Sequence, residues 1–120
     1  MAYVQGFVIP VPETNRQAYR DLAARTAPIF REHGATRIVE CWGDALPDGT
    51  TTDFRKAVKA EDGENVVFSW IVWPDRATAD AAHEKIMSDP RMAEPDAIPF
   101  DGKRMIYGGF VPIFDTDEGL

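Results

Sequence analysis

The chain has 120 residues, 44% of them hydrophobic, and its 20 acidic against 13 basic residues give a formal net charge of −7. This length predicts a single domain, residues 1–120, with a core of ordinary size. A negative charge with scattered lysines and arginines argues against nucleic acid or an anionic membrane as a partner. With neither a leader pattern at the amino terminus nor an apolar run of about 20 residues, we expect a cytoplasmic protein.

Metal and cofactor chemistry is not indicated by the composition. Cys41 is the single cysteine, so no disulfide can form within the chain. Beside it there are two histidines, His33 and His83, which is too few for a Cys/His zinc site. We therefore expect no metal site and no tightly bound cofactor.

The first elements in chain order are a strand and a helix. Residues 3–11 are β-branched and aromatic and end at prolines, which predicts a strand. Thr14 and Gln17 have the spacing of a capping box, so a helix should follow and end at His33, with Gly34 as its left-handed stop. Pro28 inside that helix predicts a kink.

The middle of the chain predicts further strands. Residues 35–43 form the second strand, and the polar segment 44–52 should be a mobile loop. Residues 54–60 fit a short extra strand. Residues 66–73 give the strongest strand pattern in the chain and are apolar on both sides of the strand.

A second helix follows, and Asp75 should cap it. Asp89 before Pro90 predicts a further short turn of helix after it. The helix should bury a stripe of residues at helical spacing, namely Ala79, Ala82, Ile86 and Met87.

The last predicted strand covers residues 99–114 and opens with a reversal at Asp101-Gly102, where Gly102 should have a positive φ. Gly108 and Gly109 interrupt its apolar pattern. Such a pair predicts that another part of the molecule approaches the backbone closely, or that the strand bends there.

The order strand, helix, strand, strand, helix, strand is that of the ferredoxin-like split βαβ fold, an α+β class with an antiparallel sheet and both helices on one face. Two helices cover one face only, whereas the third and fourth strands are apolar on both faces. A second copy would cover the remaining face and give a homodimeric α/β barrel.

Four sequence blocks carry a resemblance to a known family. They are YVQGFVIPVP (residues 3–12), VECWGD with PDG (39–44 and 47–49), VVFSWIV (66–72) and PFDGKRMIYGGF (99–110). The chain resembles the YbaA-like bacterial family of unknown function (DUF1428). The resemblance implies the dimeric α/β barrel superfamily, which also contains cofactor-independent monooxygenases, isomerases and haem proteins, but it implies no reaction. Gln5 stands where this family pattern leads us to expect an acidic residue.

Alternation along the strands sorts side chains by face. One polar residue recurs on the same parity in three strands: Gln5, Glu40 and Ser69. We place the side chains of this parity, which include Ile71, on the helix-free face inside the barrel, with Tyr107 beside them. The opposite parity, which includes Cys41, should then pack against the helices. Such an apolar cavity with a few polar groups would bind a small molecule; a satisfied polar cluster in a dimer core is the alternative.

Glu40 is the one carboxylate on that parity and is the candidate acid or base. Its structural alternative is a salt bridge to Arg37, Arg104 or an arginine of a partner chain. Gln5, Ser69 and Tyr107 are candidate ligand-binding residues, and Trp42 and Trp73 would stack on a planar ligand, although strand aromatics are more often core. Asp101, Lys103 and Arg104 would either hold an anion or form a solvated rim.

Two functions are compatible with these patterns. The first is a homodimer that binds or transforms a compact aromatic or quinone-like molecule inside the barrel without a tightly bound cofactor, an expectation that depends partly on superfamily analogy. The second is a non-catalytic dimeric module whose barrel is filled by side chains. A cavity of a few hundred Å³ would favour the first.

Overall fold

We describe the protein from a computed structural model, which covers residues 2–93 and 98–117. Two short 3₁₀ turns, Glu13–Asn15 and Pro90–Met92, accompany the helices and strands. The helices and strands in chain order are β1 (Tyr3–Pro12), α1 (Arg16–Glu32), β2 (Arg37–Trp42), α2 (Phe54–Ala57), β3 (Glu64–Trp73), α3 (Arg76–Met87) and β4 (Ile106–Phe110).

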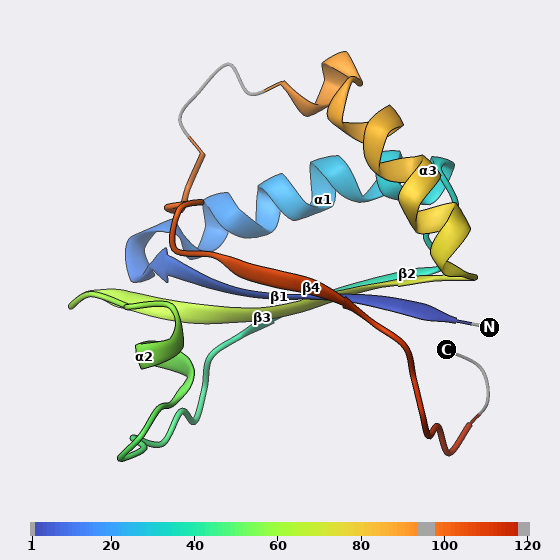
Figure 1. Cartoon of the computed structure of the whole chain (residues 1–120). Coiled ribbons are helices and arrows are strands. Elements are labelled where there is room, and N and C mark those ends of the chain that lie inside the picture. Colours follow the sequence, from blue (N-terminus) through green and yellow to red (C-terminus); the bar gives the residue numbers. More distant parts are fainter. Residues whose placement is uncertain (1, 94–97, 118–120) are drawn as a thin grey trace.

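The four strands form one antiparallel sheet in the order β2-β3-β1-β4. This order, with α1 and α3 as the two connections, is that of the split βαβ arrangement, so the predicted α+β class is confirmed. Both long helices lie on the same side of the sheet, as Figure 1 shows, and α2 lies on the other side. The sheet of the single chain is open and does not close into a barrel.

Helix ends follow local sequence signals at three places. The Asp75 side chain accepts a hydrogen bond from the Thr78 backbone N–H at 2.7 Å and so caps α3, and Asp89 caps the Pro90–Met92 turn through the Arg91 N–H at 2.8 Å. Gly34 follows α1 with φ = +112°, a conformation that glycine adopts without strain. These three expectations are confirmed.

The predicted capping box at Thr14 and Gln17 is wrong. Asn15 is the N-cap of α1 without a side-chain cap, and Gln17 instead donates to the Asp21 carboxylate one turn ahead at 2.9 Å. Asn15 uses its amide to hold the carbonyl of Pro99 at 3.0 Å, which ties the start of α1 to the segment before β4. α1 runs through Pro28 from Arg16 to Glu32 without interruption.

Segment 54–60 is helical at its start, and not a strand. Asp53 accepts the Lys56 N–H at 2.7 Å, and this N-cap starts α2 where a short strand was predicted. Met87 does not join the buried stripe of α3, which consists of Ala79, Ala82 and Ile86, because it lies at the exposed end of the helix.

The last strand is shorter than residues 99–114, since pairing is restricted to β4. The reversal at Asp101 is present, but Gly102 does not have a positive φ. Asp101 makes the turn through its own side chain, which accepts the Lys103 N–H at 3.0 Å, so no left-handed residue is required.

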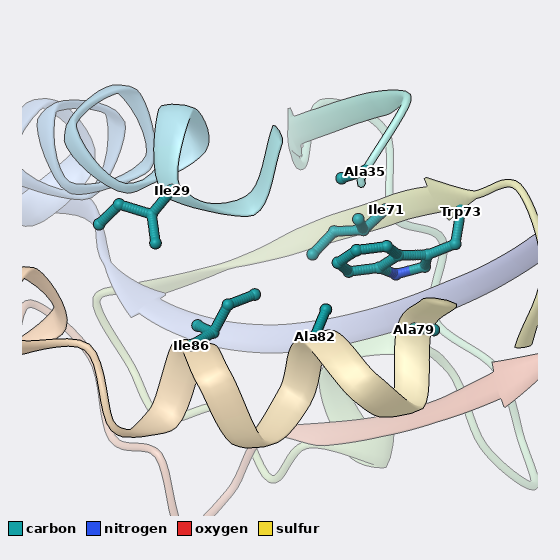
Figure 2. Close-up of a cluster of buried hydrophobic side chains, with 7 residues drawn as sticks. All are labelled: Ile29, Ala35, Ile71, Trp73, Ala79, Ala82 and Ile86. Atoms are coloured by element: carbon teal, nitrogen blue, oxygen red, sulfur yellow. The ribbon is translucent and has the colours of Figure 1, made fainter. Parts of the chain in front are cut away.

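The face assignment made from parity is also wrong. Gln5, Ile38 and Ile71 are neighbours in register, and Ile71 is 5% exposed because it packs under α1 and α3 against Ile29 and the α3 stripe. Figure 2 shows this core, with Trp73 beside Ile71. The polar parity therefore lies beneath the helices, and the opposite parity, including Cys41, faces the helix-free side. We call that helix-free side the open face.

Close backbone approach at the glycine pair is confirmed for Gly109. A Cβ placed on Gly109 would collide with the phenol ring of Tyr3 on β1. We expect Gly109→Val to destabilise the chain by about 1–3 kcal/mol, because the Tyr3 ring must leave its position. Denaturant unfolding should show this loss, and in a Tyr3→Ala background the same substitution should cost much less.

Asp80→Ala is the control for this experiment. Asp80 is exposed on α3 and forms a surface ion pair with Arg76 at 3.4 Å, so its loss should change stability by less than about 0.5 kcal/mol. Equal, small effects of Gly109→Val and Asp80→Ala would contradict a packing role for Gly109.

Candidate functional site

Three polar side chains from three elements meet beneath α1. Tyr19 on α1 donates its hydroxyl to Oε1 of Glu40 on β2 at 2.7 Å. Ser69 on β3 is paired with Glu40 in register, and its hydroxyl hydrogen-bonds the same carboxylate. Tyr19 and Ser69 are buried, with Ser69 2% exposed, whereas Glu40 lies on the edge strand and is exposed to solvent on its outer side. We call these residues the polar trio.

Burial and hydrogen bonding act in opposite directions on the Glu40 carboxyl. Burial raises the pKa of Glu40 above its usual range, and the bonds from Tyr19 and Ser69 offset part of this shift. The pKa of Tyr19 is also raised, first by burial and then by the neighbouring Glu40 charge, so the phenol stays protonated and remains a donor. The trio is thus a carboxylate with a raised proton affinity held by two hydroxyls.

A cavity of about 290 Å³, cavity A, lies between α1 and the sheet and has the polar trio in its wall. Most of the wall is apolar. Phe100, from the segment before β4, packs edge-on against the Tyr19 ring with centroids 5.7 Å apart. The other apolar side chains of cavity A are Phe7, Ile9, Leu22, Ala23, Ala27, Phe30, Ile38, Ile71, Met92 and Met105.

A neighbouring cavity of about 300 Å³, cavity B, lies between α3 and the sheet. Gln5, Trp73, His83 and Tyr107 contribute its polar atoms. The Trp73 indole donates to the Gln5 side-chain carbonyl at 2.9 Å, which fixes the Gln5 amide at the cavity wall. Cavities A and B share four lining residues, namely Phe7, Phe30, Met92 and Met105.

The structure thus divides the predicted site residues into groups. Glu40 and Ser69 lie at cavity A, and Gln5, Trp73 and Tyr107 lie at cavity B, where Tyr107 is largely exposed and stacks on Phe7 at 6.3 Å.

Trp42 lines neither cavity A nor cavity B, but with Tyr19 and Glu40 it lines a separate pocket of about 260 Å³. The guanidinium of Arg16 lies over its ring at 5.4 Å, near the outer edge of β2. Its ring is therefore not in position to stack on a molecule in cavity A or cavity B.

Tyr19 is the residue of the candidate site that sequence reasoning missed. The helical period marks Tyr19 as core, and nothing in the spacing shows that its hydroxyl would reach a strand 21 positions later. A tyrosine on a buried helical stripe, facing a strand that carries a lone glutamate, is the signal that was present, because a buried phenol hydroxyl needs a partner.

The structure contradicts a salt bridge of Glu40 to Arg37 or Arg104 and an anion site at Arg104. Within residues 2–93 and 98–117, Glu40 forms no salt bridge, and its partners are hydroxyls. Arg104 instead binds Glu64 through two bonds of 2.6 and 2.7 Å and Asp101 through a third of 2.9 Å. These carboxylates occupy the guanidinium that an anion would need.

Two further findings concern the described part of the chain. No three histidine, cysteine, aspartate or glutamate side chains there gather closely enough to hold a metal ion. None of the helices there has the length and apolar character needed to cross a membrane.

Comparison of the sequence with known families identifies the class of protein. Residues 2–102 match the model of the protein family of unknown function DUF1428, and the chain belongs to this family. The uncharacterised protein YbaA of Escherichia coli K12 is 60% identical over 116 residues, which cover 96% of this chain and 99% of YbaA, and YbaA of Shigella flexneri gives the same figures.

Two solved structures are distantly similar. Rv0793 from Mycobacterium tuberculosis matches with a TM-score of 0.43 and 13% identity, covering 97% of this chain and 99% of that one. The de novo designed protein Foldit4 matches with a TM-score of 0.45 and 13% identity, covering 93% and 99%. Scores at this level have no bearing on function.

Proposed function

We propose that this protein binds a compact, largely apolar molecule carrying a hydroxyl group, such as an aromatic alcohol or a quinol, in cavity A. The observation behind the proposal is the polar trio in an apolar wall. Glu40 is the acceptor for the ligand hydroxyl, since Tyr19 and Ser69 donate to its carboxylate and leave further acceptor positions on its two oxygens. The raised pKa of Glu40 suits it to take up the hydroxyl proton.

The cavities support binding over a filled interior. Cavity A and cavity B, at about 290 and 300 Å³, lie at the lower limit of the volume expected of a small-molecule site, which is about 300 Å³. The aromatic side chains Phe7, Phe30 and Phe100 in the wall of cavity A favour a flat, aromatic ligand. The location differs from the one inferred from parity, because these cavities lie between the sheet and the helices.

We also propose that the protein is a cytoplasmic homodimer joined through the open face. Phe68 is 46% exposed on that face in the single chain, beside Trp70 and α2 residue Phe54, with ring centroids 5.6 and 6.0 Å away. Exposed aromatic clusters of this kind usually mark an interface. A second copy is the occupant we infer, because a two-fold axis brings the same apolar face to both sides.

Ligand binding is tested by thermal unfolding with 2-naphthol, using naphthalene as the matched compound without the hydroxyl. At about 100 times its dissociation constant, 2-naphthol should stabilise the protein by about 2.7 kcal/mol. Glu40→Gln should weaken this effect, since a neutral amide is the poorer acceptor. Ala27→Phe, which places a ring in cavity A, should abolish it.

The matched control for the cavity variant is Ala24→Phe. Ala24 is exposed on α1 and lines neither cavity, so this change adds the same ring outside the site. Equal stabilisation by naphthalene and 2-naphthol would contradict the role of Glu40. A 2-naphthol response that Ala27→Phe leaves intact would place the ligand elsewhere.

A further inference from the structure

The segment that follows β4 is apolar and exposed, and no other part of the described chain covers it. In residues 111–117, which we call the arm, Ile113 is 99% exposed and Phe114 is 83% exposed, and Val111 is also exposed. Pro112 has no backbone N–H and cannot continue the ladder, so β4 ends here. Figure 1 shows the arm extending away from the sheet on the side opposite α1 and α3, which is the side of the open face.

The open face carries a hollow at two glycines, Gly6 and Gly108, and the chain's own Phe110 ring lies beside them, 3.3 and 3.7 Å from where their Cβ atoms would stand. Gly6 on β1 and Gly108 on β4 are paired in register, so two neighbouring positions of the sheet lack a Cβ. A space of about 200 Å³ lies there, and Phe68, Ile106 and Phe110 are among the side chains around it. We call this space the glycine hollow.

The arm cannot fill the hollow of its own chain by continuing its path. β4 runs from Ile106 to Phe110, so Gly108 lies two residues before the strand ends, and the arm departs from the far end, where Phe110 pairs with Val4. The arm, which carries the exposed Ile113 and Phe114, thus leads away from the sheet (Figure 1). An apolar arm and an apolar hollow lie on the same side of one chain, but do not meet within it.

We infer that the arm of each copy packs into the glycine hollow of a second copy across the dimer axis. An isologous dimer places each arm opposite the partner's open face and forms the contact twice. The chemistry also fits a second copy of an acidic chain, since the hollow is lined by uncharged residues and brings no like charges together. This inference depends on the proposed dimer and adds the segment that locks it.

The test compares dimer dissociation constants by sedimentation equilibrium in full-length variants. Phe114→Asp adds a charge to the arm, and Gly108→Leu fills the hollow, where a new Cβ would meet the Phe110 ring of its own chain at an ordinary 3.7 Å. Each change should raise the dissociation constant at least tenfold while circular dichroism shows an unchanged fold. Ala81→Asp, on the exposed side of α3, should leave it unchanged.

A mixed cross-link provides direct evidence of the contact. In a Cys41→Ser background, a copy with Ile113→Cys and a copy with Gly108→Cys should be joined by a short bis-maleimide, whereas Ala81→Cys with Gly108→Cys should not. If Phe114→Asp and Gly108→Leu leave the dimer unchanged and no cross-link forms, the arm exchange is wrong although the dimer exists. A monomeric wild-type protein would overturn both.

Discussion

Replacing Phe68 by aspartate should convert the proposed dimer into a folded monomer, whereas the same replacement at Ile71, three residues further along β3, should unfold the chain. The two positions differ in parity, so their side chains point to opposite faces. Phe68 is half-exposed in the single chain, and its loss removes little from the monomer's own core. Ile71 is buried under both helices, and aspartate there would be an unpaired charge.

The expected sizes of these effects are very different. An uncompensated buried charge costs about 3–5 kcal/mol, a large part of the 5–15 kcal/mol that stabilises a typical domain. At Phe68 the two-fold axis would bring two new carboxylates to the interface, and like charges oppose association. Sedimentation equilibrium and circular dichroism together separate the two results.

Phe68→Leu is the control, because it keeps an apolar side chain on the open face and should remain dimeric. A folded monomer from Ile71→Asp together with a dimer from Phe68→Asp would mean that the two faces of the sheet have the opposite roles. That outcome would support the assignment made from parity and contradict the packing of Ile71 against α3.

The second expected result is that Glu40 and Glu64 titrate on opposite sides of the ordinary glutamate pKa of about 4.3. Burial raises the pKa of Glu40, whereas the bonds from Arg104 lower the pKa of Glu64. NMR observation of the side-chain carboxyl carbons gives both values in one titration, with Glu40→Gln assigning the Glu40 signal. A Glu40 pKa below about 4 would remove it as a proton acceptor.

The same shifts give opposite signs for stability against pH. The folded state binds the Glu40 proton more tightly than the unfolded state does, so its contribution is fully present below about pH 4.3 and is lost as the pH rises through the folded pKa. Glu64 contributes above the unfolded pKa, and its contribution is lost as the pH falls through its lowered value. Each trend is the difference in the free energy of unfolding between the wild-type chain and the variant Glu40→Gln or Glu64→Gln. Urea unfolding across this pH range measures both differences.

Tyr19→Phe tests whether the trio acts as described. Its hydroxyl lowers the pKa of Glu40 by bonding to the charged form, so its removal should move the Glu40 pKa further upward. An unchanged value would show that the hydroxyl does not govern the carboxyl.

Local sequence signals were enough to predict the four paired strands and the two long helices in their order, but not α2 or the length of β4. Apolar runs fixed β1 and β3, Asp75 and Asp89 marked the starts of helical segments, and Gly34 marked the end of α1, because each signal acts within a few residues. Alternation also grouped Gln5, Glu40 and Ser69 correctly on one side of the sheet, since the strand period of two is local.

Tertiary structure alone decided which side that was. Both parities of β3 are apolar, so no pattern within the strand indicates the face on which the helices lie. The polar residues were assigned to the helix-free face on the assumption that helices pack on purely apolar surfaces. Glu40 and Ser69 lie beneath α1 instead, where Tyr19, distant in sequence, satisfies Glu40, and Gln5 lies beneath α3. This long-range packing is encoded by no local period.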